Sequence, residues 1–497
     1  MPPSPPLRVL CALSSGVDSS VSALMCLRPS PSLLTSLQST AKKNGWEGKV
    51  GEVGTRVEVA GVHVSSWSDH DNPNGGQYCE TSNQDYRRVQ SLASHLSTIP
   101  TLPTITWSPT VYRLDLVREY WTSVFSPFVD SLSLNVSPHS RTIVTPNPDV
   151  SCNEFIKFGH LRKKAVNDMG YHVLVTGHYA SLNGGMWEGE DLSKDQTYFL
   201  CTTRMEDFQG VHFPLEHTLK GGPRASTGKT GKDDTGVLPD VKSTLPIPAA
   251  TATTRDIAAH FNLPSASAPD STGICFVNPP PTSTGGSSVR GVGGVTDFNK
   301  FLSSFTEIPE RNDRMGIYED IDTGSVVGQF EITDSNNPLL LTMGQSAKIP
   351  GAPVKYFVAG RGETKKGEGR VIKVAGGTRN ENLYRDRVEV KVGFNFMDGN
   401  MGENGRAMGR VRHLQPLVPC TYTIKPSGSV SVLFDRPLRA PCIGQVLCLY
   451  SSLPGEGGRR RKVLGGGRID GLGRNYKEMG KRVEEPAKSG ANDKSVP

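Results

Sequence analysis

A loop of small residues near the N-terminus has the composition of a phosphate-binding turn. It reads Ser14-Ser15-Gly16-Val17-Asp18-Ser19-Ser20, follows an apolar run at 7–13 and precedes a run with helical spacing at 21–27. In a strand–loop–helix arrangement, backbone N–H groups and hydroxyls face the positive end of the helix, which favours bound phosphate. The loop lacks the lysine of the G-x-x-x-x-G-K-[ST] motif, so it differs from kinase-type nucleotide sites. The alternative is a polar turn in which serines cap the helix.

A reactive cysteine is predicted in the segment 145–154, which reads Thr-Pro-Asn-Pro-Asp-Val-Ser-Cys-Asn-Glu. The two prolines favour an extended approach, and the apolar spacing that follows predicts a helix beginning around Cys152. A thiol at a helix N-terminus has a lowered pKa and is a better nucleophile. Asp149, three residues earlier, is placed to move protons for a substrate. The alternative is an aspartate cap beside a buried, inert cysteine.

A second cysteine segment lies at 270–277 and reads Asp-Ser-Thr-Gly-Ile-Cys-Phe-Val. Its Cys275 follows Cys152 by 123 residues, and this spacing alone does not show that the two thiols meet. The chain has nine cysteines and no C-x-x-C pair, which argues against a zinc ribbon or a thioredoxin-like site. The odd number also disfavours a secreted disulfide framework.

The elements that would position these residues alternate between strands and helices in the first half of the chain. An apolar run at 7–13 predicts a strand covered on both faces, and further strands are predicted at 56–64 and 172–176. Helical spacing follows at 85–96 and 114–129. This alternation predicts an α/β fold with a doubly wound domain at the N-terminal side. Beyond about residue 340, short β-rich runs predict a small C-terminal antiparallel β-barrel.

Composition bounds the remaining possibilities. A chain of 497 residues is long enough for about three domains. Glycine and proline, with 54 and 36 residues, exceed average usage and predict long loops; we interpret 30–54, 221–248 and 278–294 as surface insertions. No apolar stretch approaches the roughly 20 residues of a membrane span, and the N-terminus shows no signal peptide. The net charge of +6 permits a polyanionic partner.

Six segments, in order along the chain, resemble the tRNA-uridine 2-sulfurtransferase family, also called tRNA-specific 2-thiouridylases. The loop at 14–20 is itself similar to the S-G-G-V-D-S-S loop of ATP pyrophosphatases. The six matches are T-P-N-P-D-x-x-C-N at 145–153, T-G-H-Y-A at 176–180, K-D-Q-[ST]-Y-F-L at 194–200, F-P-L at 213–215, D-S-x-G-I-C-F at 270–276 and V-L-G-G-G-x-I at 463–469. Segments 382–386 and 412–420 look closer to eukaryotic mitochondrial members than to bacterial ones.

The resemblance implies a reaction. Family members replace the C2 oxygen of the wobble uridine in Lys, Glu and Gln tRNAs with sulfur, after ATP has adenylated that oxygen. The resemblance places the persulfide carrier at Cys275, the second catalytic cysteine at Cys152 and the acid/base group at Asp149. Attack by Cys152 on the persulfide leaves a Cys152–Cys275 disulfide, which a reductant must reduce to two thiols. Thiolate attack on a sulfur–sulfur bond is the established route for such exchange.

The resemblance also implies binding residues. The ATP residues would be Ala12, Leu13, Ser14, Ser15, Gly16, Val17, Asp18, Ser19, Val64 and Gly177. Asp18 is the expected partner of the magnesium ion that accompanies ATP, and no tightly bound metal or prosthetic group is expected. The tRNA contacts would be Asn147, Pro148, His178, Lys194, Asp195, Gln196, Arg412, His413 and Gln445. Three motifs depart from the family pattern. Its F-x-G-x-R-x-F run is replaced by the Pro- and Gly-rich segment 278–294, its G-Q-R is Gly344-Gln345-Ser346 here, and Ile443 replaces the proline of P-G-Q.

The implied partners are the tRNA anticodon stem-loop, a cysteine desulfurase or sulfur-relay protein as persulfide donor, and a thiol reductant. No membrane partner is expected. The wobble base would be flipped out of its stack towards Cys152. The implied location is mitochondrial, with plastid and cytoplasm as alternatives. The domain plan is a catalytic domain at 7–275, a central tRNA-contacting domain at 276–356, a β-barrel at 357–470 and a flexible tail at 471–497.

Two rival functions remain at this stage. One is another adenylating enzyme on the same fold, such as an amidotransferase or a 2-thiocytidine synthase. The latter would need C-x-x-C iron–sulfur ligands, which the sequence lacks. The other is a catalytically silent tRNA-binding protein, against which the presence of Asp18, Asp149, Cys152 and Cys275 argues.

Overall fold

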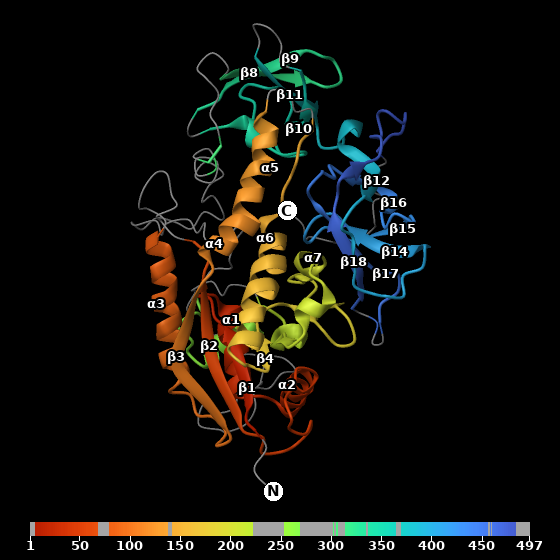
Figure 1. The fold of residues 1–497 in the computed structure, drawn as a ribbon. Coiled ribbons are helices and arrows are strands. Elements are labelled where there is room, and N and C mark those ends of the chain that lie inside the picture. Colours follow the sequence, from red (N-terminus) through yellow and green to blue (C-terminus); the bar gives the residue numbers. More distant parts are fainter. Residues whose placement is uncertain are drawn as a thin grey trace, which may run out of the picture.

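The structure is a computed structural model. It describes residues 5–67, 79–137, 142–221, 253–268, 302, 305–306, 314–333, 336–363, 369–455, 458 and 460–483. Three main sheets are separated in space (Figure 1): a parallel sheet at the N-terminal end, a four-stranded sheet at the opposite end, and an eight-stranded sheet beside them. The predicted insertions at 221–248 and 278–294 fall almost wholly outside the described residues.

The N-terminal sheet has five strands in the order β3-β2-β1-β4-β7, all parallel. The strands are β1 (Leu7–Ala12), β2 (Val57–Ser65), β3 (Ile105–Asp115), β4 (Val173–Val175) and β7 (Val211–His212). This order confirms the predicted doubly wound α/β domain. The strand order reverses between β1 and β4, and ligands of such sheets bind outside the carboxyl ends of the strands at this switch point.

Helices cover both faces of this sheet. Leu7, Val9 and Cys11 of β1 pack in one apolar cluster with residues of α1 (Val17–Leu27), α3 (Cys79–Leu96) and α8 (Thr254–His260). Leu10, which points the other way, packs in a second cluster with residues of α4 (Val117–Tyr120), η2 (Trp121–Phe125) and α5 (Ser126–Val136). The continuous apolar run of β1 therefore reflects burial on both sides, as parallel strands require.

The segment 30–54, predicted to be a surface insertion, contains a packed helix. α2 (Pro31–Lys43) begins at an N-cap, Ser30, whose side chain accepts a hydrogen bond from Leu33 N at 3.2 Å. Leu37 and Ala41 are buried in the same cluster as α1. The interpretation as an insertion was wrong for these residues, because serines and threonines between the apolar positions obscured a helical stripe.

The remaining elements of the first domain are short, except that the first three named next follow one another as one continuous helix. They are α6 (Pro148–Ser151), η3 (Cys152–Leu161), η4 (Lys164–Asp168), β5 (Ala180–Ser181), β6 (Trp187–Glu188), α7 (Thr197–Leu200), η5 (Met205–Phe208) and η6 (Pro214–His217). The helix predicted at 114–129 begins only at Val117, because β3 continues through Asp115. α5 extends from the parallel sheet towards the four-stranded sheet (Figure 1), and its Leu132 and Val136 share an apolar cluster with that sheet.

The central sheet has the order β10-β11-β8-β9, with β8 (Met315–Asp320), β9 (Val326–Glu331), β10 (Tyr356–Arg361) and β11 (Arg370–Gly376). A short helix, η8 (Pro338–Leu340), lies between β9 and β10. Strand β11 pairs with β8 in parallel and with β10 antiparallel. The sheet therefore extends to Gly376, beyond the boundary predicted at 356. Short β-rich runs do not reveal which sheet a strand joins, and this is why the sequence placed the boundary too early.

The C-terminal sheet is antiparallel throughout, in the order β13-β18-β17-β14-β15-β16-β12-β19. After η9 (Glu381–Leu383) its strands are β12 (Tyr384–Val390), β13 (Asn395–Phe396), β14 (Asn404–Arg410), β15 (Val418–Ile424), β16 (Val430–Arg439), β17 (Val446–Ser451), β18 (Val463–Arg468) and β19 (Gly471–Leu472). Strand β12 leads directly into β13, and β18 into β19, although these strands stand at opposite ends of the order. The two ends of the sheet must therefore meet, which makes it a barrel.

The first part of the predicted flexible tail is folded. Strand β19 pairs with β12, Tyr476 N donates to Tyr384 O at 3.0 Å, and Lys481 Nζ lies 3.0 Å from an oxygen of Asp386. Residues 471–483 thus belong to the barrel, and the remainder of the tail lies outside the described residues. None of the helices in the described part of the chain is long and apolar enough to cross a membrane.

Candidate active site at the switch point of the parallel sheet

The loop between β1 and α1 is folded by its own hydroxyl groups. Ser14 Oγ lies 3.0 Å from Ser19 Oγ, Ser14 N donates to Ser19 Oγ at 3.1 Å, and Gly16 N donates to Ser14 Oγ at 3.2 Å. The N-cap of α1 is Gly16, and no side chain caps this helix. The serines therefore shape the loop rather than cap the helix, and the amide groups of the first turn remain available for an anion.

Gly177 holds the loop after β4 against this turn. A Cβ atom at Gly177 would lie 2.7 Å from Asp18 C and 2.8 Å from Ser19 N, closer than side-chain atoms pack. On the other side of β1, His63 Nδ1 lies 3.1 Å from Leu13 O, and burial lowers the pKa of His63. Val64, one strand away on β2, is half-buried. The predicted ATP residues therefore gather at the carboxyl ends of β1, β2 and β4.

Asp18 is paired with a lysine that the sequence analysis missed. Lys220 Nζ lies 2.6 Å from Asp18 Oδ2, and Tyr179 OH donates to Asp18 Oδ1 at 2.9 Å. The Lys220 side chain is only 5% exposed. Burial and the Asp18 charge raise the pKa of Tyr179, which keeps this phenol protonated as a donor. Lys220 lies 202 residues after Asp18 at the edge of a Gly- and Lys-rich stretch, where no spacing signal marked it.

The described residues hold no group of three or more His, Cys, Asp or Glu side chains suited to a metal ion. Two carboxylates reach the loop: Asp18 lies within it, and Asp85 accepts a hydrogen bond from Ser15 Oγ at 2.9 Å. Magnesium in nucleotide sites is commonly bound by one or two carboxylates together with substrate phosphates. Asp18 fits that pattern, and magnesium would there neutralise charge on the ATP phosphates.

The helix that carries the predicted catalytic residues begins one turn earlier than the sequence indicated. Asn147 is the N-cap and accepts from Val150 N at 3.3 Å, Pro148 is the first helical residue, and Asp149 lies in the first turn. Cys152 therefore follows a complete turn, where the influence of the helix N-terminus has largely decayed. The prediction that Cys152 lies at the helix N-terminus was therefore wrong, and the helix end gives no reason for a lowered pKa of its thiol.

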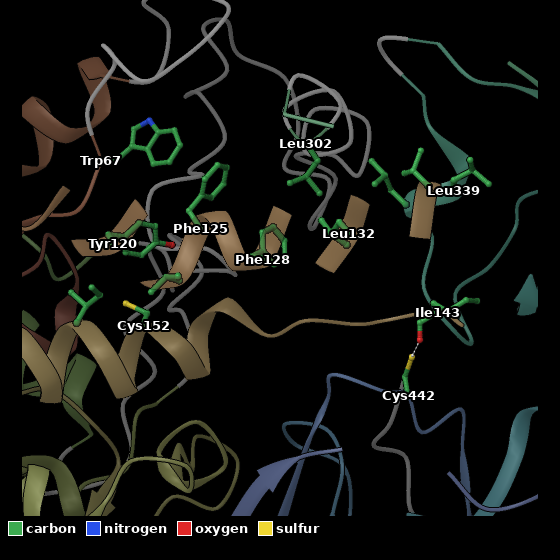
Figure 2. Packing of buried hydrophobic residues seen from close by; sticks show 14 of the residues in the cluster. Trp67, Tyr120, Phe125, Phe128, Leu132, Ile143, Cys152, Leu302, Leu339 and Cys442 are labelled. Atoms are coloured by element: carbon green, nitrogen blue, oxygen red, sulfur yellow. Dashed lines mark hydrogen bonds between the residues drawn. The ribbon is translucent and has the colours of Figure 1, made fainter. Parts of the chain in front are cut away.

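Cys152 is instead enclosed by apolar side chains. It is 5% exposed and belongs to the cluster formed by Trp67, Tyr120 and Phe125. Figure 2 shows the Cys152 sulfur on the side of its helix that faces Tyr120 and Phe125. Cys275 lies outside the described residues. Its meeting with Cys152 stays a prediction.

His178 connects the end of β4 to the catalytic helix. Its Nδ1 lies 2.7 Å from Thr176 Oγ1 and its Nε2 lies 3.1 Å from Asn153 Oδ1, while Asn153 Nδ2 donates to Asp149 O at 3.0 Å. A ring protonated at Nε2 satisfies both contacts. Burial, reinforced by the Lys157 charge, lowers the pKa of His178 well below its usual value. Both ring nitrogens are engaged inside the protein, so the predicted tRNA contact is not available to them in this arrangement.

The predicted tRNA segment 194–196 is divided between surface and interior. Lys194 and Gln196 are half-buried, and Gln196 Oε1 accepts from Tyr179 N at 3.0 Å. Asp195 is 0% exposed; Thr197 Oγ1 donates to its Oδ2 at 2.7 Å, and Arg410 Nη2 lies 3.7 Å from the same oxygen. The Asp195 side chain is therefore enclosed in the protein, and the predicted tRNA contact of this residue stays a prediction. Its carboxylate instead joins the first domain to the barrel.

Two barrel segments reach the first domain near the predicted tRNA residues. His413 Nε2 lies 2.9 Å from Asp195 O. Ile443 forms a parallel bridge with Val144 and accepts from Thr145 N at 2.7 Å. Gln445 Oε1 accepts from Cys442 N at 3.1 Å and so shapes this barrel turn. The chain leading to Asn147 and Pro148 is therefore held by the barrel.

Cys442 completes this junction. Thr145 Oγ1 donates to Cys442 Sγ at 2.9 Å, and Cys442 Sγ lies 3.2 Å from Ile143 O. Figure 2 shows the latter contact, with Leu339 of the central part nearby. The first domain, the central sheet and the barrel thus meet where the approach to the catalytic helix begins.

Comparison with known proteins agrees with this architecture. A family model described as the tRNA methyl transferase HUP domain matches residues 52–233, and one described as the aminomethyltransferase beta-barrel domain matches 390–469. The tRNA-specific 2-thiouridylase MnmA 2 of Geobacillus kaustophilus is 29% identical over 480 residues, covering 95% of this chain and 97% of its own. The tRNA-specific 2-thiouridylase MnmA of Shouchella clausii is 28% identical over 472 residues, covering 94% and 97%.

The chain is thus similar to tRNA-specific 2-thiouridylases over nearly its whole length. Another 2-thiouridylase, that of Lactobacillus delbrueckii subsp. bulgaricus, is 29% identical over 489 residues and covers 95% of this chain and 98% of its own. The family barrel match begins at the last residue of β12 and ends just after β18. These relatives are bacterial, so the predicted closeness to mitochondrial 2-thiouridylases stays a prediction.

Proposed function

We propose that this protein is an ATP-dependent tRNA-uridine 2-sulfurtransferase that acts on the wobble uridine of Lys, Glu and Gln tRNAs. One observation carries the proposal: the loop before α1, a helix without a side-chain cap, lies at the same sheet edge as the Asp149–Cys152 turn. Hydrogen bonds of His178 with Asn153 and of Asn153 with Asp149 O connect this edge to the turn. An anion-binding loop and a thiol-bearing helix at one sheet edge suit adenylation followed by sulfur transfer. The names of the similar proteins support the same reaction.

In the first step, the C2 oxygen of the uridine attacks the α-phosphorus of ATP and pyrophosphate leaves. Negative charge grows on the departing pyrophosphate, and groups fixed in advance around that charge lower the barrier. The first-turn amides of α1 and the ammonium of Lys220 lie at the proposed pyrophosphate position. Asp18 would hold the accompanying magnesium.

In the second step, the outer sulfur of a persulfide on Cys275 attacks C2. The Cys152 thiolate then attacks the sulfur of Cys275 and breaks the persulfide bond. The outer sulfur stays on C2 as AMP leaves with the former C2 oxygen, and a Cys152–Cys275 disulfide remains for a thiol reductant. Asp149 is the proposed acid/base group, one helical turn before Cys152.

The description of one matching family model mentions methyl transfer, whereas the relatives' names mention thiolation. The loop between β1 and α1 favours thiolation, because adenylation needs a pyrophosphate site and methyl transfer does not. A test on tRNA separates the two by the product formed.

The decisive experiment is nucleoside analysis of unmodified Lys, Glu and Gln tRNA transcripts incubated with ATP, magnesium and a persulfide donor. We expect wobble 2-thiouridine with the wild type, none with Cys152→Ser or Cys275→Ser, and normal product with Cys420→Ala, a buried barrel cysteine without a proposed role. Free sulfide should restore product to Cys275→Ser by replacing the persulfide. Tight tRNA binding without tRNA-dependent AMP release would contradict the proposal and favour a silent binding protein.

We also propose a mitochondrial location, with a cysteine desulfurase or sulfur-relay protein supplying the persulfide. This rests on the resemblance of segments 382–386 and 412–420 to mitochondrial members. Cell fractionation of the tagged protein should find it with a mitochondrial marker. Recovery with plastid or cytosolic markers would overturn the location while leaving the reaction unaffected.

A further inference from the structure

Arg439, the last residue of β16, reaches from the barrel to the central part of the molecule. Its Nη2 donates to Gly344 O at 3.3 Å, and its Nε donates to Thr378 O at 3.3 Å. The guanidinium lies over the ring of Phe357, 4.6 Å from the ring centre. Backbone carbonyls and one aromatic ring therefore fix this cation at the junction.

A second guanidinium is brought to the same place. A Cβ atom at Gly344 would lie 3.6 Å from Arg439 Nη1 and 3.8 Å from Arg412 Nη2. Gly344 has a φ of +80°, and its Cβ would meet that of Ala440 at 2.6 Å, so glycine is required here. Arg412 Nη2 donates to Ala440 O. The tips of both arginines thus flank one glycine.

This pair of like charges lacks a neutralising acid. Among the described residues, no carboxylate forms an ion pair with either arginine. The pKa of Arg412 is lowered by burial first and by the charge of Arg439 second. Two partly desolvated cations beside each other are unfavourable unless an anion offsets their charge. Guanidinium groups match the oxygens of a phosphate closely, often through two parallel hydrogen bonds.

The position of the pair identifies the kind of phosphate. His413, next to Arg412, contacts Asp195 O, while Ala440 is two residues before Cys442, which contacts the approach to the catalytic helix. Arg439 of the barrel contacts Gly344 and Phe357 of the central part, whereas the proposed ATP loop follows β1 of the parallel sheet, which stands apart from the other two sheets (Figure 1). An anion here belongs to a ligand that extends across domains.

We propose that Arg412 and Arg439, whose guanidinium groups both lie beside Gly344, together bind one backbone phosphate of the RNA substrate. The inference rests on the proposed function, because it takes tRNA as the ligand, and it adds Arg439 and Gly344 to the residues that hold it. The phosphate bridges the barrel and the central part, and its binding fixes the two relative to each other.

The test measures tRNA affinity as a function of salt for the full chain and its Arg439→Gln variant. Loss of one phosphate contact should lower affinity at low salt and reduce the slope of log affinity against log salt by about 1. Arg439→Lys, which keeps the charge, should retain most of the slope. Arg436→Gln is the matched control, because it removes an exposed charge from the same strand. ATP binding without tRNA should be unchanged in all three variants. Both Arg439 variants lose bonds to Gly344 O and Thr378 O and should melt at a somewhat lower temperature, so the difference in salt slope between them decides.

The outcomes separate this inference from the proposed function. If the wild type thiolates tRNA and Arg439→Gln binds it with unchanged affinity and slope, only the phosphate site is overturned. Lower affinity with an unchanged slope would show a structural role and also overturn it. An equal loss of slope in Arg436→Gln would show general attraction rather than a site. Failure of the wild type to bind tRNA would overturn both proposals.

Discussion

Lys220, which the sequence did not reveal, adds a buried positive charge to the loop site. Its ammonium is buried, pairs with Asp18 and lies over the ring of Tyr179, 6.0 Å from the ring centre. A buried lysine is retained only where its charge is matched. Asp18 supplies that match, and a pyrophosphate at the loop would offer a second anion within reach. The residue is therefore suited to respond to the nucleotide.

We predict that Lys220→Met weakens the ATP-dependent step and spares tRNA binding. Methionine fills a similar volume without the charge, so the fold should be kept while pyrophosphate loses one charged contact. Such contacts contribute about 1.5–3 kcal/mol, which corresponds to a fall in kcat/KM for ATP of about tenfold to a hundredfold. The rate of pyrophosphate release in the presence of tRNA, followed against ATP concentration, measures this fall in kcat/KM. Lys163→Met, at an exposed site on the helix of Cys152, is the control; an equal loss in both variants would refute the assignment.

At the scale of elements, the loop after β4 and the first turn of α1 touch through a single glycine. Gly177 has no room for a methyl group because backbone atoms of Asp18 and Ser19 occupy that space. The two elements are separated by about 160 residues in the sequence, and their contact sets the width of the site. Its geometry therefore depends on a backbone contact as much as on side chains.

Gly177→Ala should push these two elements apart. Overpacking of this kind costs about 1–3 kcal/mol, and the displaced loop should bind ATP more weakly. Urea unfolding and equilibrium ATP binding would report both effects. Gly399→Ala, where no atom lies within 4 Å of the added carbon, should change neither. Normal ATP affinity in Gly177→Ala would mean that the loop site does not require this contact.

The same scale shows what sequence could predict. The strand, loop and helix at 7–27 were predictable, because apolar spacing and small residues act over a few positions. The Lys220–Asp18 pair and the burial of Asp195 were not, because each depends on partners about 200 residues away. The early start of the catalytic helix was obscured by the prolines, although Pro148 occupies the first helical position that proline favours.

At the scale of the whole molecule, a buried charge network joins the first domain to the barrel. Arg410 of β14 lies 2.9 Å from Glu188 Oε1 and 3.7 Å from Asp195 Oδ2. Its guanidinium lies over the ring of Tyr450, whose hydroxyl is 3.0 Å from Thr197 Oγ1. Two carboxylates are thus enclosed in this interface with Arg410, and the charge of Arg461 also acts on Glu188.

Enclosure of Glu188 beside a second carboxylate makes the interface sensitive to pH. Burial first, and the neighbouring Asp195 charge second, raise the pKa of Glu188 to about 7. Because the folded pKa lies above the unfolded value, the folded protein binds more protons between them, and stability falls as pH rises through this window. The penalty is absent below the unfolded pKa and complete above about 7.

Glu188→Gln should remove most of this dependence, because glutamine can still accept the bond from Arg461 N at 3.0 Å without carrying charge. Between pH 5 and pH 7.5 we expect the wild type to lose up to about 2–3 kcal/mol of unfolding free energy more than the variant. Urea unfolding at both pH values measures the difference, and Glu331→Gln, at an exposed site on β9, controls for loss of a carboxylate. Equal slopes in the wild type and Glu188→Gln would show that Arg410 keeps Glu188 ionised, and the interface would then be a balanced ion network insensitive to pH in this range.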